Sequence, residues 1–336
     1  MIDINKIKPT TGTRTPLKDV VPLQEPYALY IYPTNRCNFR CKYCVHSLQK
    51  SVLEAEYGID NRDMTLKTFK NAVDGLFGMG SPLKTMVFVG QGEPLLNRDL
   101  AQMIGYAKKK KATNRTEIIT NASLLTHELT DELLSAGLDV LRVSLQGLTS
   151  ESYKNICNAK VDFGVFLEQL TYFFDNKRDT QLYVKVIDEA LEEGDEALFY
   201  ETFDPISDRM FIEKVKPVYA GVHYKENPDE VTVDRYGNAH APRYVCPLPF
   251  YMITVWPDGS VAPCEAIYKP VTLGNVNEHM LLDLWQGAEL MKFWQDQLRY
   301  GKNSFNRCLN CCAPDDVSHS LDILDDDRET ILQKML

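Results

Sequence analysis

Between residues 27 and 215 the chain alternates short apolar runs with longer segments in which apolar residues recur every three or four positions. The runs are rich in branched and aromatic residues, which is typical of strands buried in a parallel sheet. The predicted strands cover residues 28–33, 85–90, 117–120, 140–145, 182–187 and 210–215. The predicted helices cover residues 66–79, 98–109, 127–136, 163–174 and 195–203.

Six strand–helix units predict an α/β fold, a partial (β/α)6 barrel of the TIM type. We expect the barrel to stay open, because eight units usually need about 250 residues and the alternation stops well before that. In such barrels the functional groups come from the loops at the carboxyl ends of the strands. The residues that follow each predicted strand are therefore the first candidates for chemistry.

Beyond the barrel the alternation of strands and helices ends, and the sequence predicts a small domain built from a β-hairpin and a helix. The hairpin turns at Trp256-Pro257-Asp258-Gly259, and the helix covers residues 280–298. We expect five segments in all: a lead-in, the barrel, a bridging insert that contacts the substrate, the small domain and an acidic tail. They lie at residues 1–26, 27–215, 216–245, 246–314 and 315–336.

The 336 residues include 37 Lys and Arg against 47 Asp and Glu, a formal net charge of −10. This surplus repels nucleic acids and anionic membranes, so neither is expected as a partner. No apolar run is long enough to span a membrane and no signal-peptide pattern is present, so we expect a cytoplasmic protein. In that reducing compartment the nine cysteines, which occur at short spacings, indicate metal sites rather than disulfides.

Cys37, Cys41 and Cys44 follow the first predicted strand, with three and then two residues between them. Three thiolates on one loop can hold three irons of a [4Fe–4S] cube and leave the fourth iron open to another ligand. The alternative is a structural zinc ion, which usually has four protein ligands. Because His46 is too close behind Cys44 to serve as the fourth, the spacing favours an iron–sulfur cluster with one open corner.

This cysteine spacing, with Tyr43 directly before the third cysteine, resembles the signature of radical SAM enzymes. Gly90-Gln91-Gly92-Glu93-Pro94, after the second predicted strand, resembles the family's glycine–glutamate motif with Gln91 inserted. The resemblance implies that Gly92 lets the backbone approach closely and that the Glu93 carboxylate meets the ammonium group of S-adenosylmethionine. It also implies that Tyr43 lies beside the adenine, although the ring could instead pack in the core.

Two more strand ends are similar to positions of the same family. Thr120-Asn121-Ala122 resembles a Thr-Asn-Gly motif, with Ala122 in place of glycine, and Ser144 matches a position that often contacts the ribose. Asn121 and Ser144 could equally be ordinary strand-end residues. The resemblance implies that a cluster reduced by flavodoxin or ferredoxin cleaves S-adenosylmethionine to a 5′-deoxyadenosyl radical, which then removes a hydrogen atom from the substrate.

A second cysteine group lies in the small domain and resembles the extension called SPASM, in its shortened, single-cluster version called twitch. The resemblance implies one auxiliary [4Fe–4S] cluster on Cys246, Cys264, Cys308 and Cys311. Four thiolates close such a cluster, which suits electron transfer better than ligation of the substrate. A structural zinc site is the alternative. Cys312 is adjacent to Cys311, and the spacing does not decide which of the two is the ligand.

Several residues are candidates for direct roles in the reaction. With the seven cysteines above as ligands, Cys157 and Cys312 have no metal role. A thiol beside a substrate radical could return a hydrogen atom to it, as epimerisation requires. Packing is the alternative for both. A dehydrogenase instead needs a proton acceptor. Candidates near late strand ends or in the insert are Asp188, Glu189, Arg209 and His223, each of which could also be an exposed charge.

Three classes of function remain. The first is an oxidoreductase or epimerase that acts on a hydroxyl-bearing carbon of a small polar substrate, such as an aminocyclitol or a sugar. The second modifies a peptide or protein by the same hydrogen abstraction. The third, a non-enzymatic iron–sulfur electron carrier, is disfavoured by the Gly92-Glu93 motif. The lead-in is shorter than a peptide-recognition domain and a single auxiliary cluster favours small substrates, so the sequence favours the first class.

Overall fold

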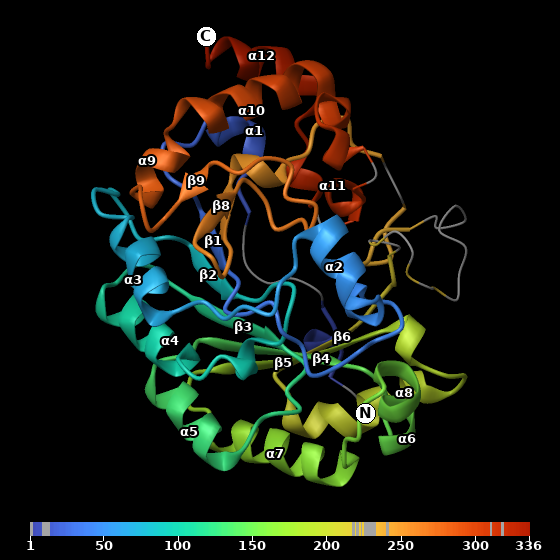
Figure 1. Cartoon of the computed structure of the whole chain (residues 1–336). Helices are drawn as coiled ribbons and strands as arrows, with labels where there is room; N and C mark the ends of the chain where they lie inside the picture. Colours follow the sequence, from blue (N-terminus) through green and yellow to red (C-terminus); the bar gives the residue numbers. More distant parts are fainter. Residues whose placement is uncertain are drawn as a thin grey trace.

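One sheet of nine strands, in the order β6-β5-β4-β3-β2-β1-β7-β8-β9, runs through the part of the chain that the structure describes (Figure 1). The structure is a computed structural model. It describes residues 3–8, 14–216, 219, 222, 224, 233–239, 242–309, 311–316 and 319–336.

Strands β1 to β6 are parallel, pair in sequence order and form the partial barrel. Their bounds are Ala28–Ile31, Thr85–Phe88, Thr116–Thr120, Val140–Leu145, Gln181–Ile187 and Arg209–Glu213. All six predicted strands are confirmed, with ends that differ by no more than two residues. Leu141 and Val143 of β4 pack into the main core, while Arg142 and Ser144, which alternate with them along the strand, face the other side of the sheet.

The five predicted helices are also confirmed and cover the outer face of the sheet (Figure 1). They are α3 (Leu66–Asp74), α4 (Leu100–Lys109), α5 (His127–Ser135), α7 (Phe163–Asn176) and α8 (Asp195–Phe203). Helix α5 begins where the Thr126 hydroxyl accepts a hydrogen bond from the N–H of Leu129. Helix α7 begins in the same way at Asp162, whose carboxylate accepts from the N–H of Gly164.

The predicted hairpin is part of the same sheet. Its strands are β7 (Met252–Val255) and β8 (Ser260–Ala262), followed by β9 (Gly274–Asn275). Strand β7 pairs in parallel with β1, so the small C-terminal region extends the barrel sheet beyond its first strand. The turn closes as predicted, because the N–H of Gly259 donates to the carbonyl of Trp256 (2.9 Å) and Gly259 has a φ of +86°.

The predicted helix at 280–298 is two helices, α9 (Leu281–Trp285) and α10 (Ala288–Tyr300), with Gly287 between them in an extended conformation. In the acidic C-terminal segment, α12 (Arg328–Gln333) packs on α10 and buries Ile331 and Leu332. The short helices α1 (Leu17–Val20) and α11 (Ala313–Asp316) flank this layer (Figure 1).

Two helices of eight residues each were not predicted: α2 (Lys50–Tyr57) and α6 (Ser150–Cys157). Each spans little more than two turns, too short for an apolar period to be recognised. Helix α6 begins at Thr149, whose hydroxyl accepts from the N–H of Ser152 (3.0 Å). In the described part of the chain, no helix has the length and apolar content needed to cross a membrane.

Candidate active site

The segment 37–44, with its three cysteines, is the loop that follows β1 at the carboxyl end of the sheet. Helix α6 supports this loop: the N–H of Arg40 donates to the carbonyl of Cys157 at 2.9 Å. The Phe39 ring is buried beside it and meets the Tyr153 ring edge-on, 5.9 Å between centroids. One buried ring and one backbone hydrogen bond therefore shape the loop between its first two cysteines.

The start of the loop is tied to the segment before α3. The guanidinium of Arg36 makes a two-pronged ion pair with Asp63, from Nε at 2.9 Å and from Nη2 at 2.5 Å. The Thr34 hydroxyl donates to the same carboxylate at 2.6 Å. Because two-pronged pairs fix orientation as well as distance, this pair anchors the residue directly before Cys37.

Gly92 lies against the backbone of this same loop. A Cβ at position 92 would stand 2.5 Å from the carbonyl oxygens of both Thr34 and Arg36, so only glycine fits. The N–H of Glu93 donates to the Arg36 carbonyl at 2.8 Å. The close approach in the structure is to the backbone just before the cysteine loop. The role of Gly92 beside S-adenosylmethionine stays a prediction.

The Glu93 carboxylate is buried, 2% exposed, and joins the ends of β2 and β3. One oxygen accepts from the N–H of Leu95 (2.9 Å) and the hydroxyl of Thr120 (2.5 Å), and the other accepts from the N–H of Asn121 (2.8 Å). Burial raises the pKa of Glu93 above its ordinary value. Since an ionised carboxylate has about four acceptor sites, one remains for a further donor such as an ammonium group.

Asn121 connects the third strand end to the cysteine loop. Its side-chain amide donates to the amide oxygen of Asn38 at 3.0 Å. The next residue, Ala122, has a φ of +58°, the left-handed region that favours glycine. The alanine that departs from the Thr-Asn-Gly pattern therefore keeps the backbone conformation that a glycine would adopt there.

The thiols of the loop are poor acids in these surroundings. Burial raises the pKa of Cys37 to about 12 and raises that of Cys44. At Cys41 the largest cause of the raised pKa is a hydrogen bond with the thiol of Cys157, followed by burial. Since metals bind the thiolate form, iron binding here must displace protons.

A cavity of about 250 Å³ lies beside the loop at the carboxyl ends of β4, β5 and β6. Tyr43 and Cys44 line it from the loop, and Ser144 lines it from β4. The Tyr43 hydroxyl donates a hydrogen bond to the side-chain oxygen of Gln146 just beyond β4. The structure thus brings together Tyr43, Cys44 and Ser144, whereas Glu93 does not line this cavity.

Lys185 of β5 and Glu213 of β6 also line the cavity and form a buried ion pair at 2.6 Å. Sequence reasoning missed both residues. The signal was a lysine inside the apolar run 182–187, because the register places Lys185 directly beside Ser144 on the neighbouring strand. Charges of Lys185 and Arg235 outweigh burial and lower the pKa of Glu213, while burial lowers the pKa of Lys185.

A second group of thiols lines one enclosed, largely apolar pocket between the hairpin and α10. Its cysteines are Cys246, Cys264, Cys308 and Cys311. Burial raises the pKa of Cys308 to about 12 and raises the pKa of each of the other three. Lys302, which pairs with Asp315 at 2.8 Å, brings a positive charge to the edge of the pocket.

Two thiols stand outside these groups. Cys312 does not line the auxiliary pocket or the cavity beside Cys44. Cys157 is fully buried behind Cys41 and does not line the cavity; its thiol donates to the carbonyl of Tyr153 at 3.0 Å. A role for either thiol as a hydrogen donor stays a prediction.

The four proton-acceptor candidates are dispersed. Asp188 accepts from the N–H groups of Glu189 and Val215 and pairs with Lys214, which ties the ends of β5 and β6 together. Glu189 lines a different hollow beside α6. Arg209 is not near a late strand end as expected, because it is the first residue of β6, where its guanidinium stacks on Tyr183. His223 lies outside the described residues.

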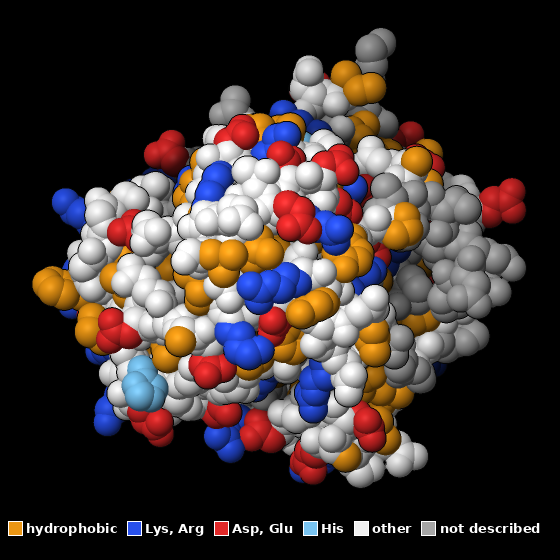
Figure 2. Space-filling model, turned by 90° about the horizontal axis from the view of Figure 1, so that it is seen from above, with side chains coloured by type: hydrophobic (Ala, Val, Ile, Leu, Met, Phe, Trp, Pro, Cys, Tyr) orange, Lys and Arg blue, Asp and Glu red, His pale blue; other side chains and the backbone are white. Residues whose placement is uncertain are grey.

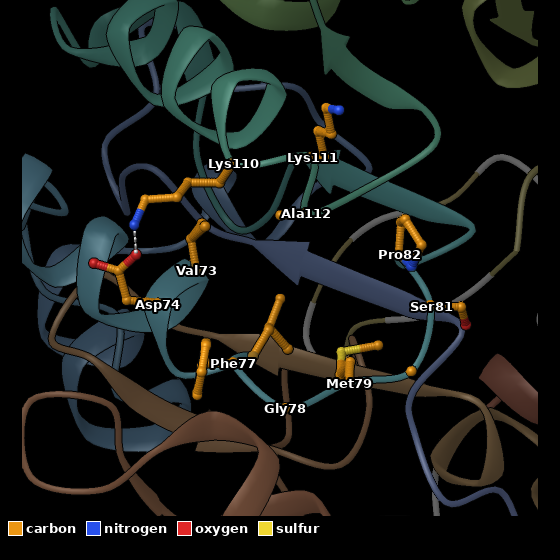
Figure 3. Close-up of a pocket in the computed structure, with 12 residues that line it drawn as sticks. Val73, Asp74, Phe77, Gly78, Met79, Ser81, Pro82, Lys110, Lys111 and Ala112 are labelled. Carbon is orange, nitrogen blue, oxygen red and sulfur yellow. Dashed lines mark ion pairs between the residues drawn. The ribbon is translucent and has the colours of Figure 1, made fainter.

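A hollow of about 650 Å³ lies at the opposite, amino-terminal ends of β2 and β3 (Figure 3). Figure 3 shows Val73, Phe77 and Met79 around it and an ion pair between Asp74 and Lys110, at 2.8 Å, on one side. It contains none of the cysteines. In barrels of this kind that end of the sheet contributes to stability rather than chemistry.

Comparison with known families identifies the superfamily of this chain. Residues 31–200, half of the chain, match the model of the radical SAM superfamily. This chain belongs to the radical SAM superfamily. Residues 246–312 match the SPASM model, an iron–sulfur cluster-binding domain. The predicted family and its SPASM extension are confirmed.

Relatives differ widely in how much they share with this radical SAM chain. The AdoMet-dependent heme synthase of Methanosarcina barkeri is 25% identical over an alignment of 306 residues, covering 78% of this chain and 83% of that protein. The Fe-coproporphyrin III synthase of the same organism is 30% identical over 128 residues. That match covers 38% of this chain, and the chain spans only 29% of that relative's length.

Solved structures share the fold at low identity. BtrN in complex with AdoMet and 2-DOIA has a TM-score of 0.55 and 18% identity, over 85% of this chain and 93% of BtrN. Streptococcus suis SuiB bound to the precursor peptide SuiA has a TM-score of 0.62 and 17% identity, over 91% of this chain and 77% of SuiB. At such identities the similarity establishes the partial barrel with its C-terminal extension and nothing more specific.

The radical SAM and SPASM matches imply a [4Fe–4S] cluster that binds S-adenosylmethionine and an auxiliary cluster. Both cysteine groups fit such clusters: the first offers three thiols on one loop, of which Cys44 lines the cavity, and the second offers four thiols that line one pocket. Among the described residues, no three His, Cys, Asp or Glu side chains could hold a single metal ion. A four-iron cube is larger than one ion, and its ligand sulfurs stand further apart.

Proposed function

We propose that this radical SAM enzyme oxidises, or epimerises, a hydroxyl-bearing carbon of a small polar molecule such as an aminocyclitol or a sugar. The observation that carries the proposal is the convergence of four thiols, Cys246, Cys264, Cys308 and Cys311, on one enclosed pocket. Four thiol ligands leave no corner of a cube open to substrate. An auxiliary cluster of that kind serves electron transfer, and transfer of an electron out of the substrate is what a net oxidation needs.

The proposed ligands of the first cluster are Cys37, Cys41 and Cys44. When bound, this cluster and S-adenosylmethionine supply the one-electron chemistry that generates a radical able to take a hydrogen atom from the substrate. The remaining acceptor site of Glu93 suits the ammonium group of methionine. Tyr43 and Ser144, on the cavity wall, suit the nucleoside.

Oxidation of a hydroxyl-bearing carbon removes a hydrogen atom, a proton and an electron from the substrate, and each needs an acceptor. S-adenosylmethionine, when bound, would supply the group that takes the hydrogen atom of the carbon, and a cluster held by Cys246, Cys264, Cys308 and Cys311 would supply the electron acceptor. The hydroxyl proton needs a base among the protein's own residues. Of the described residues that line the cavity, Glu213 is the carboxylate. It lies on the cavity wall, whereas the other candidates that the structure describes do not, so we propose it as the proton acceptor ahead of Asp188, Glu189, Arg209 and His223.

The substrate class rests on the cavity and on one fold neighbour. The charged side chains of Lys185 and Glu213 in the cavity wall, beside the part assigned to the nucleoside, suit a polar substrate. BtrN, whose structure contains 2-DOIA, shares the fold over most of its length. We further propose flavodoxin or ferredoxin as the reductant and the cytoplasm as the location, since all nine cysteines are free thiols.

Turnover in deuterated water tests the reaction type. Candidate aminocyclitols and sugars are incubated anaerobically with the reconstituted enzyme, reductant and S-adenosylmethionine, and the products are weighed by mass spectrometry. Oxidation removes two mass units, whereas epimerisation through a thiol adds one deuterium. If uptake of deuterium occurs and is lost in Cys312→Ala or Cys157→Ala, that thiol is the donor. No mass change in any small substrate, while 5′-deoxyadenosine still forms, contradicts the proposal.

Peptide modification is the second candidate. It is supported by the fold similarity to SuiB, whose structure contains the precursor peptide SuiA. The two candidates separate when peptides and small molecules are supplied in parallel. A peptide that loses two mass units, with no change in any small molecule, favours the second candidate.

A further inference from the structure

A glutamine stands on the inward side of α10, which is otherwise apolar. The other buried side chains of this helix are Leu290, Phe293, Trp294 and Leu298. Gln297 lies among them and is 0% exposed. The outer side of the C-terminal layer, seen from above in Figure 2, instead mixes Lys and Arg with Asp and Glu. Burial of an amide is costly unless its polar atoms are hydrogen-bonded, so the partners of Gln297 indicate its role.

Both ends of this amide are hydrogen-bonded beside the auxiliary pocket. The side-chain oxygen accepts from the N–H of Cys246 at 3.4 Å. The side-chain nitrogen donates to the Ser304 hydroxyl at 3.3 Å and to the sulfur of Cys308 at 4.0 Å. Gln297 also lines the pocket together with the four thiols. One side chain therefore joins two of the four proposed ligands of the auxiliary cluster.

The neighbours of the amide fix which way round it lies. The backbone N–H of Cys246 can only donate, so the amide atom that faces it is the oxygen. The Ser304 hydroxyl donates its own hydrogen to the Gly301 carbonyl at 2.7 Å, and so it accepts from the nitrogen of Gln297. The second hydrogen of that nitrogen is directed to the sulfur of Cys308.

We propose that Gln297 is a positioning residue of the auxiliary cluster, which it orients through Cys246 and tunes through the sulfur of Cys308. The inference rests on the proposed function, because it takes these cysteines as ligands of a cluster that accepts an electron. A cysteine sulfur that binds iron has lost its proton and is a stronger hydrogen-bond acceptor than a thiol.

Hydrogen bonds to the sulfurs are among the features that set the reduction potential of an iron–sulfur cluster. Reduction adds negative charge, which an N–H group directed at a ligand sulfur stabilises. Gln297 should therefore raise the reduction potential of the auxiliary cluster and make it a better electron acceptor.

Redox titration of the anaerobically reconstituted enzyme, followed by electron paramagnetic resonance, tests this role. Gln297→Met has a side chain of similar size without the amide. The equilibrium constant for reduction of its auxiliary cluster should fall about tenfold, the size of one hydrogen bond to a charged group. For one electron this is a fall of about 59 mV in potential, and the first cluster should not change. An auxiliary cluster with the wild-type potential in Gln297→Met overturns the proposal.

A second variant and a matched control accompany this measurement. Gln297→Asn keeps an amide but is one methylene shorter, which draws its nitrogen away from the sulfur of Cys308. Its potential should also fall, and it carries the test if Gln297→Met does not retain the cluster. Gln295→Met is the control on the same helix, because the amide of Gln295 donates to the Met335 carbonyl at 3.2 Å and does not line the pocket. An equal shift in Gln295→Met contradicts the proposal.

The potential keeps this test apart from the proposed function. A lowered potential in Gln297→Met, with no mass change in any small substrate of the wild type, supports the role of Gln297 while the proposed oxidation fails. Oxidation of a small substrate, with an unshifted potential in the variant, supports the proposed function and overturns the role of Gln297. About four irons per wild-type chain would overturn both.

Discussion

The two cysteine groups of this protein are built in opposite ways. Cys37, Cys41 and Cys44 lie within one loop of eight residues, which is attached to its neighbours by Arg36 and backed by α6. The four thiols of the SPASM region come from three segments, with Cys308 and Cys311 on the same one, and meet only because the hairpin, α10 and the chain after it pack together. Cys44 of the first group lines a charged cavity, whereas the pocket of the second group is largely apolar, with Lys302 at its edge.

This difference shows how far a sequence can specify a metal site. Spacing alone places three thiols of one loop near each other, since so short a segment cannot separate them widely. It cannot place Cys264 and Cys308, which are 44 positions apart, without the fold between them. The first site should therefore tolerate little change within its loop, while the second should depend on packing over a larger region.

The largest expected effect is loss of one thiol from each group. Cys41→Ala should abolish 5′-deoxyadenosine formation, because only two ligands of the first cluster remain. Cys264→Ala should lower the iron content by about four atoms and abolish product, yet leave cleavage of S-adenosylmethionine measurable. Iron assays and quantification of 5′-deoxyadenosine by chromatography check both. Loss of S-adenosylmethionine cleavage in Cys264→Ala, with the protein still folded, would contradict the claim that the two clusters have separate tasks.

The next effect concerns the backbone that supports the first site. Gly92→Ala places a Cβ 2.5 Å from two carbonyl oxygens that cannot move independently, and a shift of the loop by about 1 Å can lower the rate a hundredfold. Ala122→Gly is the matched control in the neighbouring strand end. It relieves a left-handed alanine but loosens the unfolded chain, so stability should change by less than about 1 kcal/mol. Initial rates of S-adenosylmethionine cleavage and thermal melts measure the contrast, and equal rates for Gly92→Ala and wild type would count against it.

Charge in the cavity should matter in a pH-dependent way. Glu213→Gln leaves Lys185 buried without its carboxylate, which typically costs about 3–5 kcal/mol. The folded-state pKa of Glu213 lies below its ordinary value of 4.5, so its stabilising contribution is complete above that value and is lost as the pH falls through the lowered pKa.

Unfolding of wild type and Glu213→Gln, compared at about pH 7 and about pH 4, checks this, with a larger difference expected at the higher pH. Glu329→Gln, in an exposed ion pair, is the control and should cost less than about 1 kcal/mol. A cost that is the same at both pH values would mean that the ion pair is not its cause.

The smallest effect tests the auxiliary pocket alone. Lys302 lies at its edge, and its charge lowers the pKa of Cys308 and Cys311 against the larger effect of burial. Reduction adds negative charge to a cluster, so Lys302→Gln should lower the reduction potential of the auxiliary cluster and leave the first cluster unchanged. Redox titration followed by electron paramagnetic resonance measures both, with Lys292→Gln, an exposed cation on α10, as the control. A shift in the first cluster would contradict the separation of the two sites.

The sequence predicted the elements with local signals and missed those that depend on tertiary pairing. The six strands and the loop of Cys37 were predicted because apolar runs and short spacings are local properties. The contact of Gly92 with the backbone of Thr34 and Arg36 was not predicted, because it depends on the fold. The Lys185–Glu213 pair was missed, because it depends on the register between β5 and β6 and on which face of each strand points inward.

The central claim, two clusters with separate tasks on one radical SAM chain, is tested most directly by anaerobic reconstitution followed by one combined assay. Iron and 5′-deoxyadenosine are measured on the same sample, in the presence of reductant and S-adenosylmethionine. Seven cysteines in two groups predict about eight irons per chain and steady formation of 5′-deoxyadenosine. About four irons, or eight irons without any 5′-deoxyadenosine, would contradict the claim.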